Sequence, residues 1–451
     1  MSSVQTSPER QPARLTNAAA VDWYRRNRVR TRQIFDLLTD DAYYVQPIAL
    51  RHPIVFYDGH IPAFSLNTLV KRAHGRAGID DGLERLFARG IDPDDASADS
   101  SRIASWPDRA TVKAFVDEAD ALVLDTLAHA PLEVPGHPLL HGAQAPYTIL
   151  EHEAMHQETL LYMLHRLPYD LKQAPPGYTP RVDGAAEPNT RVSIPRGRVQ
   201  LGAAPGSLAF GWDNEFGAIE LDVPAFAIDR RDVTTAEFLR FVESGGYTDP
   251  QWWTPEDLAW LTEHAITHPG FWAREDGAWS WRGMFQQLPL PPDWPVYVSH
   301  AEACAYARWS GGRLPTEADA QRAAYGAPDG EPRRFPWGDA EPTPAHGVFD
   351  FGSWDPQPVD THPAGRSAWG VDDLVGNGWK WTSTTFAPFP GFVASGSYPE
   401  YSADFFDDAH VVMKGASPVT ARELLRPTFR NWFRPRYPYV YATFRCVGGE
   451  A

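Results

Sequence analysis

Cysteine is nearly missing from this sequence, which has only Cys304 and Cys446 in 451 residues. Two cysteines cannot build a disulfide framework or a cysteine-rich zinc site. Any metal chemistry must therefore rest on carboxylates and on the 15 histidines of the chain.

Long apolar runs and an excess of basic charge are missing as well. No stretch approaches the ~18 apolar residues of a membrane helix, and residues 1–15 carry charges and prolines where a signal peptide needs an apolar core. The 58 acidic and 41 basic residues give a net charge of −17, which repels a phosphate backbone. We therefore expect a cytoplasmic protein without membrane or nucleic-acid partners.

The length of the chain predicts two domains, because one domain usually holds roughly 100–200 residues. We expect a disordered N-terminus over residues 1–16, a four-helix bundle over 17–172, a Pro- and Gly-rich linker over 173–192, and a loop-heavy α+β domain over 193–451. The fold class is thus α+β with two domains. Apolar periodicity predicts helices over 21–38, 64–75, 109–129, 147–167, 233–247 and 299–312, and polar turn residues predict a solvated loop over 90–109.

A pair of histidines, His152 and His156, lies four residues apart in the last expected bundle helix. This spacing places both imidazoles on one helix face, within reach of one metal ion. His60 lies about 90 residues upstream, where bundle geometry can bring it against that face. Three neutral imidazoles leave coordination positions open for dioxygen and a substrate, as in non-heme iron oxygenases. Nearby carboxylates, among them Glu151 and Glu158, are candidates to hold the imidazole N–H groups.

The same helix also matches the H-E-x-x-H pattern, in which Glu153 would activate water on zinc. The extended pattern needs a glycine and a third histidine at positions where this chain has Thr159 and Tyr162. A more distant carboxylate ligand would still complete a zinc hydrolase site. This alternative remains open from the sequence alone.

Ordered sequence blocks in the second half carry a family resemblance. They include FGWDNE at 210–215, GGRLPTEA at 311–318, DLVGNGWKWT at 373–382 and FRNWFRP at 429–435. With the histidines, these blocks resemble the iron-dependent sulfoxide synthases of ergothioneine biosynthesis, over nearly the whole chain. In that family a DinB-like helical bundle precedes a C-type-lectin-like domain similar to formylglycine-generating enzyme.

The resemblance implies the ligands and the substrate of the site. His60, His152 and His156 match the family's iron(II) ligands. Formylglycine-generating activity itself is not implied, because those enzymes use a cysteine pair and this chain offers only Cys446 in the matching stretch.

The segment after residue 429 matches the part of the family that holds hercynine, the trimethylated histidine substrate. Arg430, Asn431 and Trp432 correspond to it, and Phe433 follows. A quaternary ammonium binds well over an aromatic face, with a gain of roughly 0.5–2 kcal/mol. A core role for Trp432 is the alternative.

The chemistry implied by the resemblance joins a sulfur or selenium donor to C2 of the hercynine imidazole, using iron and dioxygen. A tyrosine near the metal would deliver a proton or hydrogen atom, and Tyr398 and Tyr401 are the candidates because their loop follows the 373–382 block.

Several departures from the family bear on the donor. The stretch FYDGHIPAFSLNTLV around His60 resembles the selenoneine synthases, which use a selenosugar. The family's arginine-rich stretch, which suits the carboxylates of a peptide donor, is not evident here, because Arg102 and Arg109 lie in a different sequence context. In addition, Phe433 stands where the family has an acidic residue. We therefore expect a selenosugar donor, with cysteine or γ-glutamylcysteine as the alternative. A binding module that has lost catalysis is a third possibility.

Overall fold

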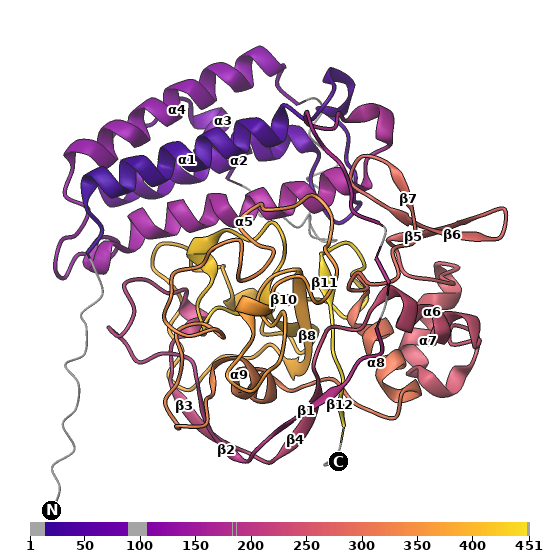
Figure 1. Cartoon of the computed structure of the whole chain (residues 1–451). Helices are drawn as coiled ribbons and strands as arrows, with labels where there is room; N and C mark the ends of the chain where they lie inside the picture. The colour runs from indigo at the N-terminus through magenta and orange to yellow at the C-terminus, as the bar shows by residue number, and fades with distance from the viewer. Residues whose placement is uncertain (1–13, 89–105, 183, 186, 449–451) are drawn as a thin grey trace, which may run out of the picture.

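The protein folds into a helical part followed by a sheet-containing part, as a computed structural model shows (Figure 1). The structure describes residues 14–88, 106–182, 184–185 and 187–448. The predicted α+β two-domain class is confirmed. Most of the predicted disordered N-terminus and of the predicted loop over 90–109 lies outside the described residues.

Four long helices run side by side in the first part (Figure 1). The second of them continues as a wider π-helical segment, Leu66–Ala73, so the expected helix at 64–75 starts ten residues earlier than predicted. Side-chain caps begin two of the four long helices, with Thr16 and Asp108 accepting from backbone N–H groups of the first turn. The helices of this part are α1 (Asn17–Phe35), α2 (Ile54–Ser65), α3 (Asp81–Leu86), α4 (Arg109–His129) and α5 (Gln144–Arg166).

Helix α5 lies between the bundle and the second part (Figure 1), and it is buried along almost its whole length. Its acidic residues contact different parts of the chain. Glu153 pairs with Arg28 of α1, whereas Glu151 and Glu158 bond to residues of the second part. A helix buried on every side needs a partner for each polar group, and α5 draws its partners from both parts of the chain.

The chain leaves the bundle through an extended segment that begins by pairing with the first part. Lys172 forms a β-bridge with Leu38, and its Nζ donates to the carbonyl oxygens of Leu164 and His165 near the end of α5. In the Pro- and Gly-rich stretch that follows, the described residues form no helix or strand, and the first strand begins at Arg191.

The second part contains small sheets in place of one large sheet. In the four-stranded sheet, β8 pairs antiparallel with β9 and parallel with β11, and β10 forms the other edge. This sheet carries the segment 431–433 next to α5. The strands are β1 (Arg191–Ile194), β2 (Gly197–Leu201), β3 (Ile219–Val223), β4 (Phe226–Asp229), β5 (Trp272–Glu275), β6 (Ala278–Arg282), β7 (Gln287–Pro289), β8 (Gly378–Thr385), β9 (Val411–Ala416), β10 (Asn431–Phe433), β11 (Ala442–Thr443) and β12 (Val447–Gly448).

Short helices of the second part begin at capping boxes. In α6, α8 and α9 a Thr or Ser side chain accepts from the third helical N–H, and an acidic side chain accepts from the cap residue's N–H. The helices expected over 233–247 and 299–312 are present, whereas α7 and α9 were not predicted. The four helices are α6 (Thr235–Glu243), α7 (Pro255–Glu263), α8 (His300–Trp309) and α9 (Glu317–Tyr325).

The core contains several large tryptophans that are almost completely enclosed: Trp212, Trp281, Trp294, Trp379 and Trp381. Within the described ranges, every helix is too short or too polar to cross a membrane.

Candidate metal centre and adjoining cavity

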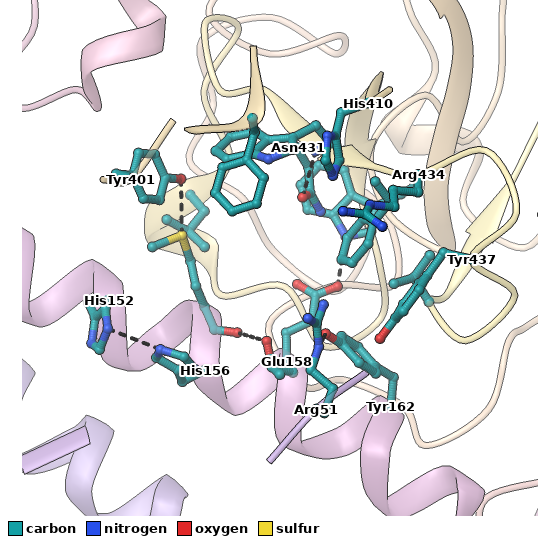
Figure 2. A pocket seen from close by; sticks show the side chains of 18 of the residues that line it. Arg51, His152, His156, Glu158, Tyr162, Tyr401, His410, Asn431, Arg434 and Tyr437 are labelled. Carbon is teal, nitrogen blue, oxygen red and sulfur yellow. Dashed lines mark hydrogen bonds between the residues drawn. The ribbon is translucent and has the colours of Figure 1, made fainter. Parts of the chain in front are cut away.

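Three histidines meet between α2 and α5. The Nε2 atom of His156 lies 3.0 Å from that of His152 and 3.2 Å from that of His60 (Figure 2 shows the α5 pair). All three side chains are buried. Within the part of the chain that the structure describes, this is the single group of three or more His, Cys, Asp or Glu residues whose ligand atoms converge within 4.8 Å.

The chemistry of this donor set fits a metal ion. Burial lowers the pKa of His60 to about 4 and holds the pKa of His152 and His156 well below the ordinary value, so all three imidazoles are neutral. Neutral imidazole is the form that binds metal. Two ligands at right angles, each ~2.1 Å from an ion, have nitrogen atoms ~3.0 Å apart, which agrees with the observed separations.

The imidazole orientation is set by the backbone at one of the three positions. His60 Nδ1 donates to the carbonyl oxygen of Phe87 at 2.7 Å, which leaves Nε2 as the lone-pair nitrogen facing the other two rings. The carboxylates suggested for this task point elsewhere, because Glu151 binds Arg426 and Glu158 accepts from Trp379. A backbone carbonyl therefore fixes the tautomer that a carboxylate often fixes in metal sites.

Glu153 does not face the three histidines as a zinc hydrolase requires. Its carboxylate accepts from Arg28 at 2.9 Å and from the Thr31 hydroxyl at 2.6 Å, both on α1. The residue is fully buried, and it is absent from the lining of the adjoining cavity. A base that activates metal-bound water must reach that water, so the geometry gives Glu153 a structural role in the bundle.

A cavity of about 480 Å³ opens beside the histidines, between α5 and the sheet edge at β10 (Figure 2). Its volume suits a small-molecule ligand. Aromatic side chains form much of the wall, and a few polar groups project between them. The lining residues are Leu50, Arg51, His152, Met155, His156, Glu158, Thr159, Tyr162, Trp379, Tyr398, Tyr401, Phe405, His410, Leu424, Phe429, Asn431, Trp432, Phe433, Arg434, Tyr437 and Val440.

Both predicted tyrosines line the cavity, at different positions relative to the histidines. The Tyr398 ring lies 5.9 Å from the His152 ring, and among the described residues its hydroxyl has no hydrogen-bond partner. Tyr401 donates to the sulfur of Met155 at 3.3 Å and stacks on Trp212. Burial raises the pKa of Tyr398 to about 12, so its phenol keeps its proton.

The predicted substrate residues separate into two groups. Asn431, Trp432 and Phe433 form β10 and line the cavity. Arg430 is 3% exposed and turns the other way, where it pairs with Glu317 at 3.0 Å and donates to the Ala387 carbonyl. Arg430 and Trp432 both contact Phe386, with the Arg430 guanidinium 5.0 Å from the centre of that ring, but Trp432 also lines the cavity, whereas Arg430 does not.

Trp432 is sandwiched in an aromatic cluster at the cavity wall. Its ring stacks on Phe386 with centroids 4.1 Å apart, and Tyr401 lies edge-on at 5.3 Å. The side chain remains half-buried and in contact with the cavity. Trp432 therefore packs against the aromatic cluster on one face and lines the cavity as well, so a core role alone does not describe it.

Glu158 is a cavity residue whose place sequence reasoning missed. Its carboxylate accepts from Trp379 Nε1 at 2.7 Å, from the Ser417 hydroxyl at 2.6 Å and from the Thr420 hydroxyl at 2.8 Å. These three donors are neutral, and burial raises the pKa of the carboxyl group. A half-buried carboxylate that lines a cavity and is held by neutral donors suits a cationic ligand. The sequence offered no local signal for this place, because residues two apart on a helix point in different directions and the partners of Glu158 all come from the second domain.

Comparison with known families assigns both parts of the chain. Residues 179–449 match the Sulfatase-modifying factor enzyme 1-like domain, and residues 24–160 match the DinB superfamily. The predicted combination of a DinB-like bundle with a formylglycine-generating-enzyme-like domain is therefore confirmed.

Individual relatives match a large share of the chain. The chain is 35% identical over 345 residues to a hercynine oxygenase of Mycolicibacterium smegmatis, covering 74% of this chain and 77% of the relative. It is 38% identical over 307 residues to a hercynine oxygenase of Mycolicibacterium thermoresistibile, covering 66% and 67%. It is 26% identical over 502 residues to the ergothioneine biosynthesis protein 1 of Neurospora crassa, covering 93% of this chain and 56% of the fungal protein.

Proposed function

The chain belongs to the sulfoxide synthase family of ergothioneine biosynthesis, a family of oxidoreductases, and on this premise we propose that it bonds a chalcogen donor to C2 of the hercynine imidazole. The converging nitrogens of His60, His152 and His156 beside the 480 Å³ cavity carry this proposal. These three residues would hold iron(II). Bound iron(II) would supply open coordination positions and the redox chemistry of dioxygen.

The balance of the reaction defines what the cavity must hold. The imidazole loses its C2–H bond, and the donor loses its S–H or Se–H bond. Dioxygen accepts four electrons and ends as one oxygen on the chalcogen and one molecule of water. Hercynine and the donor must therefore lie together in the cavity, oriented toward the histidines.

Hercynine fits between α5 and β10 with its imidazole toward the histidines. The Glu158 carboxylate and the Trp432 face would receive its trimethylammonium group, which has no hydrogen to donate. Asn431 Oδ1 accepts from the Trp432 backbone N–H at 2.9 Å, so its Nδ2 group remains to donate to the hercynine carboxylate. Opposite charges and an aromatic face would thus fix the orientation of the substrate.

Tyr398 is the better placed of the two tyrosines to donate a proton. Its ring lies beside His152, and its hydroxyl is available, whereas the Tyr401 hydroxyl is bonded to Met155. We assign proton donation to Tyr398 and the shaping of the cavity wall to Tyr401.

A thiol is the first candidate donor. The names of the relatives, hercynine oxygenase and ergothioneine biosynthesis protein 1, support sulfur chemistry. In addition, the exposed Arg434 lines the cavity and could bind a donor carboxylate. Cysteine and γ-glutamylcysteine both carry such a group.

A selenosugar is the second candidate donor, favoured by the wall beyond Asn431. Phe433 stacks on Tyr437 with ring centroids 5.1 Å apart, and Tyr162 lies edge-on to both rings. Aromatic faces and phenol hydroxyls suit the apolar faces and hydroxyl groups of a sugar.

One experiment tests the reaction and separates the donors. The iron(II)-loaded protein is mixed with hercynine and dioxygen, and cysteine, γ-glutamylcysteine or a selenosugar is added in separate reactions that are analysed by mass spectrometry. We expect a hercynine adduct with one donor class, and none without dioxygen or in the His152→Ala variant. Adducts with thiols alone would reject the selenosugar, and no adduct with any donor would reject the proposed reaction.

A further inference from the structure

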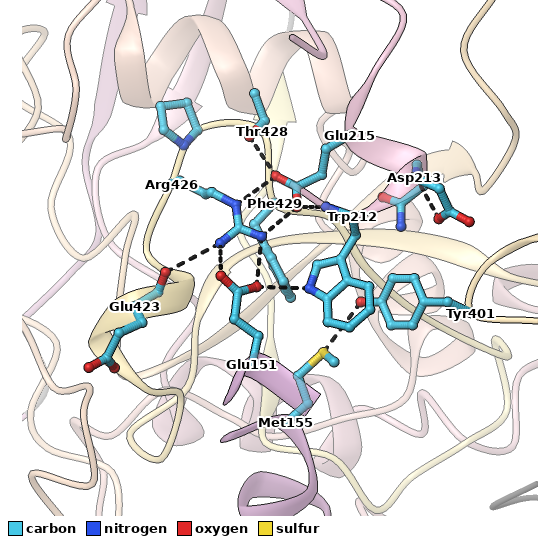
Figure 3. A network of polar contacts seen from close by, with 12 residues as sticks. Glu151, Met155, Trp212, Asp213, Glu215, Tyr401, Glu423, Arg426, Thr428 and Phe429 are labelled. Carbon is cyan, nitrogen blue, oxygen red and sulfur yellow. Dashed lines mark hydrogen bonds and ion pairs between the residues drawn. The ribbon is translucent and has the colours of Figure 1, made fainter. Parts of the chain in front are cut away.

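A buried network of charges joins α5 to the second domain outside the cavity (Figure 3). Arg426 lies at its centre. The guanidinium donates to both oxygens of Glu151, at 2.7 and 2.9 Å, and to both oxygens of Glu215, at 2.5 and 2.8 Å. One planar cation therefore holds two carboxylates from different domains in bidentate pairs, the geometry in which arginine binds most specifically.

The two carboxylates are fixed by further bonds. Glu151 also accepts from Trp212 Nε1 at 2.8 Å, and Glu215 accepts from the Thr428 hydroxyl at 2.6 Å. The exposed fraction of the side chain is 3% for Glu151, 1% for Glu215 and 14% for Arg426. A network that is buried and satisfied to this degree has essentially one arrangement, so it transmits position from one domain to the other.

The bundle end of the network lies at the metal centre. Glu151 directly precedes His152 on α5, and Met155 follows one turn later (Figure 3). Any shift of Glu151 along or around the helix axis moves the His152 imidazole with it, because both belong to the same rigid turn.

The other end of the network lies at the substrate wall. Trp212, which donates to Glu151, stacks on Tyr401 with ring centroids 3.9 Å apart. Arg426 itself begins the segment that leads to Asn431 and Trp432 on β10. The network thus joins the helix with the metal ligands to the two structures that face them across the cavity.

We propose that Arg426 is a positioning residue for the hercynine site: by clamping Glu151 and Glu215 together, it sets the distance between the histidines of α5 and the wall formed by Tyr401 and Trp432. This inference rests on the proposed function, because hercynine is the ligand whose fit it governs. A displacement of ~1 Å at such a site can cost roughly 10²-fold in rate.

The test replaces Arg426 by lysine, which keeps the positive charge but cannot form two bidentate pairs. Arg445→Lys is the matched control, because Arg445 is 1% exposed and pairs with the buried Asp232 at 2.5 Å, away from the cavity. For each variant we measure cobalt(II) stoichiometry, the melting temperature, the hercynine Kd by calorimetry on the cobalt(II)-loaded protein, and KM and kcat on the iron(II)-loaded protein.

We expect Arg426→Lys to bind one cobalt(II) as the wild type does, and to show a rise of at least tenfold in hercynine Kd and in KM. Arg445→Lys should lower the melting temperature and leave the hercynine Kd unchanged. If Arg426→Lys lowers only the melting temperature, the network is merely structural and the inference is wrong.

A second variant covers the case in which Arg426→Lys does not fold. Trp212→Phe removes the indole N–H that binds Glu151 and retains an aromatic ring against Tyr401. We expect a rise of about threefold in hercynine Kd, and an unchanged Kd would overturn the inference. Failure of the wild type to bind hercynine would instead contradict the proposed function, so the two failures are distinguishable.

Discussion

The hydroxyl of Tyr401 donates a hydrogen bond of 3.3 Å to the sulfur of Met155, which lies on α5 between His152 and His156. The tyrosine loop of the second domain therefore contacts the same helical turn that carries two of the three converging histidines. Tyr398, three residues earlier, approaches His152 with an available hydroxyl. The two tyrosines should differ sharply in their effect on turnover.

Replacing Tyr398 by Phe should lower kcat by roughly 10²-fold or more, the range typical of a lost general acid, with hercynine Kd and metal content unchanged. Tyr401→Phe is the matched comparison. It also removes a tyrosine hydroxyl from this loop, but that hydroxyl is already bonded to Met155. It should change kcat by less than tenfold. A Tyr398→Phe variant that turns over at the wild-type rate would contradict the assignment.

Replacing His152 by Ala should abolish metal binding, because only two of the three imidazoles remain. The helix keeps its other contacts, so the fold should persist. Metal content per chain after iron(II) loading, measured by mass spectrometry of the metal, checks this. His165→Ala is the control: His165 is another buried histidine of α5, bonded to Tyr441 and to the Arg282 carbonyl. Full iron content in His152→Ala would show that the histidines do not form the site.

The convergence of the three histidines could be predicted from the sequence because its signal is local. A spacing of four on one helix places His152 and His156 on the same face, and a bundle needed only to supply His60. Glu158 shows the limit of such reasoning. Its partners Trp379, Ser417 and Thr420 lie 221 to 262 residues away, so only the packing of the second domain against α5 reveals that its carboxylate lines a cavity.

Arg430 shows a second limit. It belongs to the same motif as Asn431 and Trp432, yet it pairs with Glu317 on α9, a helix that the sequence did not predict. The motif shows which residues occur together in the sequence, and the packing of the second domain decides which of them line the cavity. The expected role in binding hercynine passes to Asn431 and Trp432, and we predict that Arg430 acts on stability.

Lys172, which directly precedes the linker, should give the protein a measurable pH dependence. Burial, with the nearby Arg282 and Arg166, lowers its pKa to about 7 in the folded chain, against ~10.4 for a free lysine. The unfolded chain therefore binds more protons between these values, and the free energy of unfolding should rise as the pH increases from about 7 toward ~10. Urea unfolding across this range measures the slope.

Lys172→Met should flatten that slope, because methionine does not titrate. The exposed Lys113→Met variant serves as the control and should keep the wild-type slope. Equal slopes in the wild type and Lys172→Met would refute the proposed contribution of this lysine.

Replacing Trp432 by Ala should weaken hercynine binding and leave metal content normal. The loss of a cation–π contact corresponds to roughly 0.5–2 kcal/mol, or about 2- to 30-fold in Kd. Trp279→Ala, on the β6 strand and in contact with His268, is the control for the loss of a partly buried tryptophan. An unchanged hercynine Kd in Trp432→Ala would limit Trp432 to packing against Phe386.

Glu158→Gln should weaken hercynine binding by roughly tenfold to a hundredfold, because it removes the negative charge that faces the trimethylammonium group. The amide keeps the size of the side chain and one acceptor oxygen for Trp379 or Thr420, so the fold should persist. Calorimetric titration with hercynine checks the affinity, and titration with a neutral imidazole that lacks the ammonium group checks that the loss is specific to the cation.

Glu302→Gln is the matched control for Glu158→Gln. Glu302 is buried, and like Glu158 it accepts from neutral donors, which here are the Tyr247 hydroxyl and the backbone N–H and hydroxyl of Ser299. It lies on α8, away from the cavity, so its replacement should leave hercynine affinity unchanged. Equal hercynine Kd in both variants would mean that the charge of Glu158 serves the interface with β8. The ammonium group would then rely on aromatic contact alone.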